Sequence, residues 1–179
     1  YLRGAGMVLV DLLRQDRNPG IRDSTKRRAA HSRSFPAETL TTLRHSNSEH
    51  THTAVTALGL FDQAAQALGQ PGLHWNTKRC ELTAGAYLSP HYDPADVQAY
   101  LILDRTEETP HEESGTFVFS DPRAGIQNVF VPGMPWNKSV SVRAEPGRFF
   151  AAPGWLATMV TPLAEGEHLS WLHLQGSRY

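Results

Sequence analysis

The stretch GAYLSPHYDP, residues 85–94, contains an H-x-D pair within a segment that is predicted to be a β-strand. His91 and Asp93 are two residues apart, so we expect their side chains on one side of the strand. An imidazole nitrogen and a carboxylate oxygen can then converge on one metal ion. Two histidines and one carboxylate, with open positions opposite, are typical of non-heme Fe(II) sites. The chain has nine histidines, so a solvated turn before Pro94 is the alternative interpretation of the same pair.

Length and composition narrow the classes of function. The 179 residues suffice for one domain with a sizeable core. A net charge of -1 gives no basic footprint for nucleic acid, and the apolar run at 7–13 is too short to cross a bilayer. Cys80 is the only cysteine, as suits a reducing cytosol without disulfides. We expect a cytoplasmic protein that acts on a small molecule or peptide, not on nucleic acid or a membrane.

The periodicity of apolar residues changes at Gly72. Before it, helices are predicted at Pro36–Arg44 and Thr53–Leu68, and a basic cluster at 22–33 is interpreted as a solvated loop or, alternatively, a lid. After it, short runs separated by turn residues predict strands near 76–83, 87–91, 97–103, 115–120, 128–131, 139–144, 148–151, 156–161 and 168–174. This order predicts one mainly-β domain over residues 1–179, a jelly roll buttressed by N-terminal helices.

Four ordered segments strengthen the interpretation of the H-x-D pair: the stretch quoted above, AYLIL at 99–103, GTFVFSDPR at 115–123 and PGRFFAAPGWL at 146–156. Together they resemble the segments of 2-oxoglutarate/Fe(II) oxygenases, over residues 73–175. The resemblance implies a double-stranded β-helix, cupin-like. Residues 1–70 lie outside it, and we expect them to give helical support and a possible lid. The resemblance also implies Fe(II) as metal, held by His91 and Asp93, and 2-oxoglutarate as co-substrate.

Two positions depart from the family pattern. Thr158 stands where the family has the third iron ligand, a histidine, and His168 stands where it has the arginine that pairs with 2-oxoglutarate. A neutral hydroxyl is a poor Fe(II) ligand, and a histidine is a weaker carboxylate partner than arginine. A hairpin through 162–166 would place Thr158 opposite His168 and complete a displaced His91/Asp93/His168 site. Alternatively, His168 only forms a hydrogen bond within the pocket.

Other residues have two interpretations each. Tyr87 lines the pocket or belongs to the core, and Arg123 binds a carboxylate or lies in a turn. The resemblance implies that Ser170 assists binding of 2-oxoglutarate. Tyr100 has the same alternatives as Tyr87. The alternation of side chains predicts that His173 faces away from the pocket.

The leading hypothesis is an oxygenase-like enzyme that hydroxylates, desaturates or cyclises its substrate with a non-standard metal site. One alternative is a non-redox cyclase, isomerase or lyase on the same fold, with His91, Asp93 and His168 as acid/base groups. The other is a catalytically inactive binding module. The resemblance leaves use of 2-oxoglutarate open, because the arginine is missing.

Overall fold

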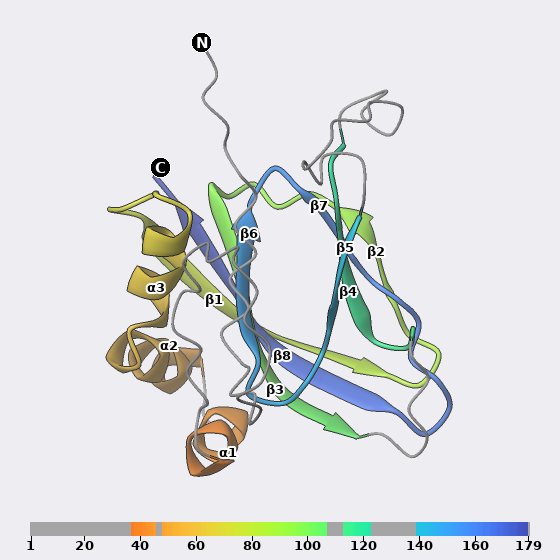
Figure 1. Cartoon of the computed structure of the whole chain (residues 1–179). Coiled ribbons are helices and arrows are strands. Elements are labelled where there is room, and N and C mark those ends of the chain that lie inside the picture. Colours follow the sequence, from red (N-terminus) through yellow and green to blue (C-terminus); the bar gives the residue numbers. More distant parts are fainter. Residues whose placement is uncertain (1–36, 46–47, 107–112, 123–138, 179) are drawn as a thin grey trace, which may run out of the picture.

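The computed structural model describes residues 37–45, 48–106, 113–122 and 139–178 (Figure 1). Its helices are α1 (Ala37–His45), α2 (Ser48–Ala57) and α3 (Leu60–Ala67). Its strands are β1 (His74–Thr83), β2 (Leu88–His91), β3 (Val97–Thr106), β4 (Thr116–Ser120), β5 (Val140–Arg143), β6 (Phe149–Pro153), β7 (Ala157–Val160) and β8 (His168–Ser177). None of the described helices is long and apolar enough to cross a membrane.

The strands form two four-stranded antiparallel sheets that face each other (Figure 1). The first sheet has the order β1-β8-β3-β6, and the second has the order β2-β7-β4-β5. The three helices pack on the outer face of the first sheet (Figure 1). The predicted double-stranded β-helix is confirmed.

Strand β8 lies in the middle of the first sheet and is buried on both faces. Leu172 and Leu174 belong to the helix-side core, where they meet residues of the three helices. Leu169 and Trp171 belong to the inter-sheet core between the two sheets. The odd-numbered residues of β8 therefore face the second sheet, and the even-numbered ones face the helices.

The prediction of one continuous helix over Thr53–Leu68 is wrong. The chain forms two helices that meet at Gly59, whose φ of 67° lies in the left-handed region. Glycine adopts that conformation at low cost, so Gly59 interrupts the helical pattern between the end of α2 and the start of α3. The bend lets Phe61 stack on Trp75 of β1, with ring centroids 5.0 Å apart.

The predicted hairpin that would bring Thr158 opposite His168 is also wrong. Strands β7 and β8 belong to different sheets, so the segment between them crosses from one sheet to the other. Several predictions fall outside the described residues: the basic cluster at 22–33, the strand near 128–131 and the role of Arg123.

Candidate ligand site between the sheets

His91 ends β2 and faces the space between the sheets. It is the register partner of Thr158 on β7, and an irregularity between Leu88 and His91 shifts the alternation of this strand. The simple alternation of side chains from Tyr87 to His91 is therefore broken. The Nδ1 atom of His91 lies 3.1 Å from the carbonyl oxygen of Ser89. A carbonyl only accepts hydrogen bonds, so this contact puts the ring proton on Nδ1 and leaves Nε2 with a free lone pair.

Asp93 lies in the loop that follows β2, and two backbone hydrogen bonds hold this loop. The Asp96 N–H donates to the Gly176 carbonyl at the end of β8, and the Gly154 N–H donates to the Asp96 carbonyl. A Cβ atom added to Gly154 would stand 1.7 Å from the Ala95 carbonyl oxygen, so this close approach requires glycine. The loop directs Asp93 toward β8.

The Asp93 carboxylate meets two side chains of β8. Its Oδ1 accepts a hydrogen bond of 2.8 Å from Gln175 Nε2, and its Oδ2 lies 2.9 Å from His173 Nε2. The Asp93 and His173 side chains are only 8% and 9% exposed. Neither Oδ2 nor Nε2 has a partner of regular hydrogen-bond geometry among the described residues. Two lone pairs this close repel each other unless a proton or a metal ion lies between them.

The position of His173 corrects the prediction that it faces away from the pocket. The prediction placed His168 and Ser170 inside, and it therefore assigned the opposite face to His173. Because β8 is buried on both faces, its apolar residues do not alternate and the sequence contains no signal of which face is inward. The His173 ring stacks on Tyr100 of β3, with centroids 4.7 Å apart and planes inclined by 5°.

The local charges keep Asp93 ionised. Burial raises the pKa of its carboxyl group, but the nearby His173, the hydrogen bond from Gln175 and the charge of His91 together lower the pKa below its ordinary value. The site therefore presents a carboxylate with imidazoles on two sides.

Thr158 is fixed in a buried network around Gln98 of β3. Both residues have no exposed surface. Gln98 Oε1 accepts hydrogen bonds from Thr158 Oγ1 at 3.0 Å and from the Tyr100 hydroxyl at 2.6 Å. Gln98 Nε2 donates to the carbonyl oxygens of Pro153 and Leu156. All four hydrogen-bonding positions of the amide are thus satisfied, and the Thr158 proton is committed to Gln98.

His168 and Ser170 lie away from this site. The Nε2 atom of His168 lies 2.6 Å from Glu81 Oε1 on the neighbouring strand β1. Ser170 is buried on the same outward face of β8 and pairs in register with Glu81 and Asp104. The prediction that His168 reaches into the pocket is wrong because residues at even positions of β8 face outward.

Two more side chains on the inward face of β1 were missed. Lys78 is the register partner of His173 and is exposed, and Cys80 is the partner of Trp171. Burial raises the pKa of the Cys80 thiol, while the positive charge of Lys78 lowers it. Burial also raises the pKa of Tyr100, which therefore remains a neutral donor. Tyr87 is 60% exposed, so its core interpretation is excluded.

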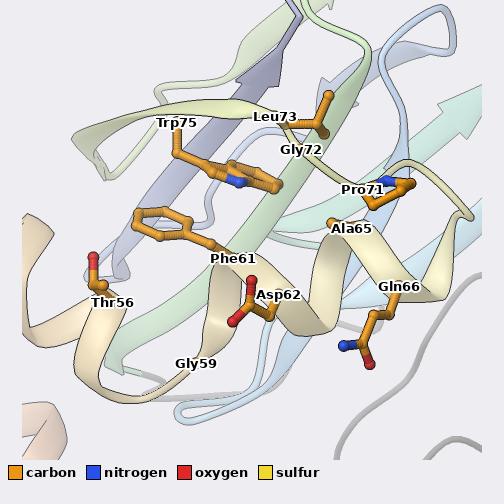
Figure 2. Close-up of a pocket in the computed structure, with 10 residues that line it drawn as sticks. All are labelled: Thr56, Gly59, Phe61, Asp62, Ala65, Gln66, Pro71, Gly72, Leu73 and Trp75. Atoms are coloured by element: carbon orange, nitrogen blue, oxygen red, sulfur yellow. The ribbon is translucent and has the colours of Figure 1, made fainter.

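A separate hollow of about 270 Å³ lies between α3 and the start of β1 (Figure 2). Phe61 and Trp75 stack within it, and Asp62 is its charged residue. It lies on the helix side of the first sheet, away from the space that contains His91 and Asp93.

The conventional iron ligands of the fold do not fit this chain, because the third position is a hydroxyl that donates to Gln98. No three His, Cys, Asp or Glu side chains among the described residues already stand close enough to share one ion. The donor types do fit: His91, Asp93 and His173 are two imidazoles and one carboxylate on the inward faces of two facing sheets. These are the ligand types of a non-heme Fe(II) site.

The two facing sheets form a double-stranded β-helix, the fold seen in solved structures of 2-oxoglutarate/Fe(II) oxygenases. The chain matches a prolyl-4-hydroxylase from Pseudomonas putida at a TM-score of 0.55 and 17% identity, covering 80% of this chain and 84% of that one. It also matches HygX from Streptomyces hygroscopicus, a structure with iron bound, at a TM-score of 0.51 and 14% identity. The match covers 82% of this chain and 80% of that one.

A third similar structure is SnoN, a non-heme alpha-ketoglutarate-dependent epimerase from nogalamycin biosynthesis. It matches at a TM-score of 0.52 and 16% identity, covering 79% of this chain and 71% of that one. No family model matches the chain, and no curated protein matches it in sequence.

Proposed function

We propose that the chain is a metal-dependent, oxygenase-like enzyme that oxidises a small molecule or peptide bound between the two sheets. The observation that carries this proposal is the H-x-D pair at the end of β2, directly opposite the third ligand position on β7. His91 and Asp93 would hold Fe(II). When bound, the metal would supply O2-dependent oxidation of the substrate. The co-substrate 2-oxoglutarate would be converted to succinate and CO2.

The tautomer of His91 suits ligation. Histidine ligands of metals usually donate their other ring N–H to a carboxylate or backbone carbonyl, which fixes the tautomer and the ring. The contact between His91 Nδ1 and the Ser89 carbonyl has this form. His91 is also partly exposed, so it remains accessible to an incoming ion.

A carboxylate-bearing co-substrate needs a positive charge, and His168 does not supply it from the outward face. Lys78 stands beside His173 on the inward face of the first sheet, where its exposed ammonium group can meet a carboxylate. Lysine binds as a point charge and not in the two-pronged manner of arginine. We expect 2-oxoglutarate to bind more weakly than it would with arginine.

The test is an anaerobic titration of metal-free protein with Fe(II) and then 2-oxoglutarate, followed by visible absorption. A weak charge-transfer band in the middle of the visible range supports the proposal. Lys78→Met should weaken 2-oxoglutarate binding and leave Fe(II) binding unchanged, whereas His168→Gln should change neither. Absence of both the band and retained iron would contradict the proposal.

One observation favours a second function. A proton shared between Asp93 Oδ2 and His173 Nε2, 2.9 Å apart, would make an acid/base pair for a non-redox isomerase or lyase. The two functions differ in their products. Succinate formed only when Fe(II) is added, and lost with EDTA, indicates the oxygenase. Substrate conversion that survives EDTA indicates the acid/base enzyme.

A further inference from the structure

We infer that His173 on β8 replaces the missing β7 histidine as the third protein ligand of the metal, giving a His91/Asp93/His173 site. The inference rests on the proposed function and adds a ligand from a strand that predictions from the sequence placed outside the site. The first observation that supports it is the contact between Asp93 and His173.

The separation of the two atoms matches that of neighbouring metal ligands. Imidazole nitrogens and carboxylate oxygens bind metals at about 2.1 Å, so two ligands at a right angle around one ion stand about 3 Å apart. The distance between Asp93 Oδ2 and His173 Nε2 is 2.9 Å. A hydrogen bond has a similar length, so distance alone does not decide between the two.

The hydrogen-bond geometry leaves room for a metal ion. Both atoms are buried, and neither has a regular hydrogen-bond partner among the described residues. Buried polar atoms without partners are rare in folded proteins, because leaving them unsatisfied costs free energy that a bound ion or an ordered water can recover. An ion between the two atoms would satisfy both at once.

The surroundings keep His173 in place and Thr158 out of reach. His173 stacks against Tyr100, whose hydroxyl donates to the fully satisfied Gln98. The same Gln98 accepts the Thr158 proton. The chain therefore has a fixed imidazole on one side of the site and a fixed neutral hydroxyl on the other.

The remaining step is a movement of His91. Its ring is partly exposed and is not yet gathered with Asp93 and His173 at metal-binding distance. Rotation of an exposed side chain is fast and inexpensive. Metal binding would turn His91 Nε2 toward the pair and close the site between the two sheets.

The test uses Co(II) as the probe, under anaerobic conditions, with the full chain. Affinity is measured by calorimetry, and coordinated imidazoles are counted by the shifted ring N–H signals in proton NMR. The wild type should bind one Co(II) with two such signals. His173→Gln should lose one signal and weaken binding by at least about 100-fold, the upper end of the effect of losing an outer-shell partner.

Two controls separate the alternatives. His168→Gln removes a histidine from the same strand on the opposite face, and Thr158→Val removes the hydroxyl at the family's ligand position; both should retain both signals. Circular dichroism and thermal unfolding of each variant establish that it is folded. His173→Phe, which keeps an aromatic ring against Tyr100, is the second variant if His173→Gln does not fold.

The outcomes distinguish the inference from the proposed function. Co(II) binding that is unchanged in the folded His173 variants overturns the inference and leaves the metal-dependent function standing. A wild type that binds no Co(II) overturns both. Weaker Co(II) binding in Thr158→Val, but not in the His173 variants, would also overturn the inference.

Discussion

Glu167 and Asp93 are two carboxylates at opposite ends of the space between the sheets. Glu167 precedes β8 and lies 3.7 Å from Arg105 of β3, with both side chains 1% exposed. Asp93 contacts His173, six residues further along the chain than Glu167, a span of about 20 Å along a strand. The first pair, at the closed end, is buried, whereas the second, at the open end, has the partly exposed His91 and the exposed Lys78 beside it.

The partners of the two carboxylates explain this difference. The Arg105 guanidinium donates to the carbonyl oxygens of Ala144 and Ser114, and the Ser114 hydroxyl donates to Glu167. These contacts hold the Arg105 guanidinium beside Glu167 in the buried core. At the other end, the contact between Asp93 and His173 lacks regular hydrogen-bond geometry. We infer that charge at the closed end stabilises the fold, and that charge at the open end binds a ligand.

The largest effect is expected for Glu167→Gln. This change leaves the buried Arg105 charge without its counterion, which costs about 3–5 kcal/mol of unfolding free energy. Urea denaturation measures it. Glu165→Gln, at an exposed position two residues away, should change stability by less than about 0.5 kcal/mol. A loss below about 1 kcal/mol for Glu167→Gln would contradict the structural role of this pair.

Tyr100→Phe tests the network that separates the two ends. It removes one of the two donors to Gln98 Oε1 and keeps the stacking on His173. We expect a loss of about 1 kcal/mol in unfolding free energy. Tyr87→Phe is the matched control, because Tyr87 is exposed and should lose nothing measurable. Equal effects of the two substitutions would show that the Gln98 network contributes no stability.

His173→Phe should destabilise the metal-free protein less than Glu167→Gln does. The phenyl ring keeps the contact with Tyr100, and Asp93 keeps its hydrogen bond from Gln175. We expect a loss smaller than that of Glu167→Gln, because the hydrogen bond from Gln175 still satisfies one oxygen of Asp93. Urea denaturation in EDTA measures it. A loss as large as that of Glu167→Gln would make both ends structural and remove the contrast between them.

The smallest effect concerns the Cys80 thiol on the inward face. Because burial raises its pKa, alkylation by iodoacetamide should accelerate at a pH above the ordinary thiol value of 9.0. Lys78→Met removes the charge that lowers this pKa, so the inflection should move to still higher pH. The rate profile of alkylation against pH measures both. An inflection unchanged by Lys78→Met would place the ammonium group too far from the inward face to serve the site.

Much of the fold could be predicted because its signals are local. Turn residues and short apolar runs identify the strands, including β1, β4 and β8, to within a few residues. The resemblance placed Thr158 at the third ligand position, and the structure pairs Thr158 of β7 with His91 of β2. Both depend on patterns within a few residues of each other.

The ligand site depends on long-range packing and could not be predicted fully. Because β8 is buried on both faces, nothing in its sequence shows that His173 is inward and His168 outward. The irregularity in β2 shifts its alternation, and Pro90 within this strand is the local signal that could have indicated it. Gly59 was likewise compatible with a continuous helix, and only packing of α3 on the sheet shows that the helix breaks there.

The saturated amide of Gln98 has a consequence for how this site can change by mutation. Thr158→His would restore the family's ligand, but it would place a larger ring where no surface is exposed and would remove a donor from Gln98. The single substitution should therefore be strongly unfavourable, although it becomes acceptable once position 98 is also smaller and apolar. The two positions are epistatic, so a return to the ordinary ligand set requires at least two steps, the first of which brings no benefit of its own.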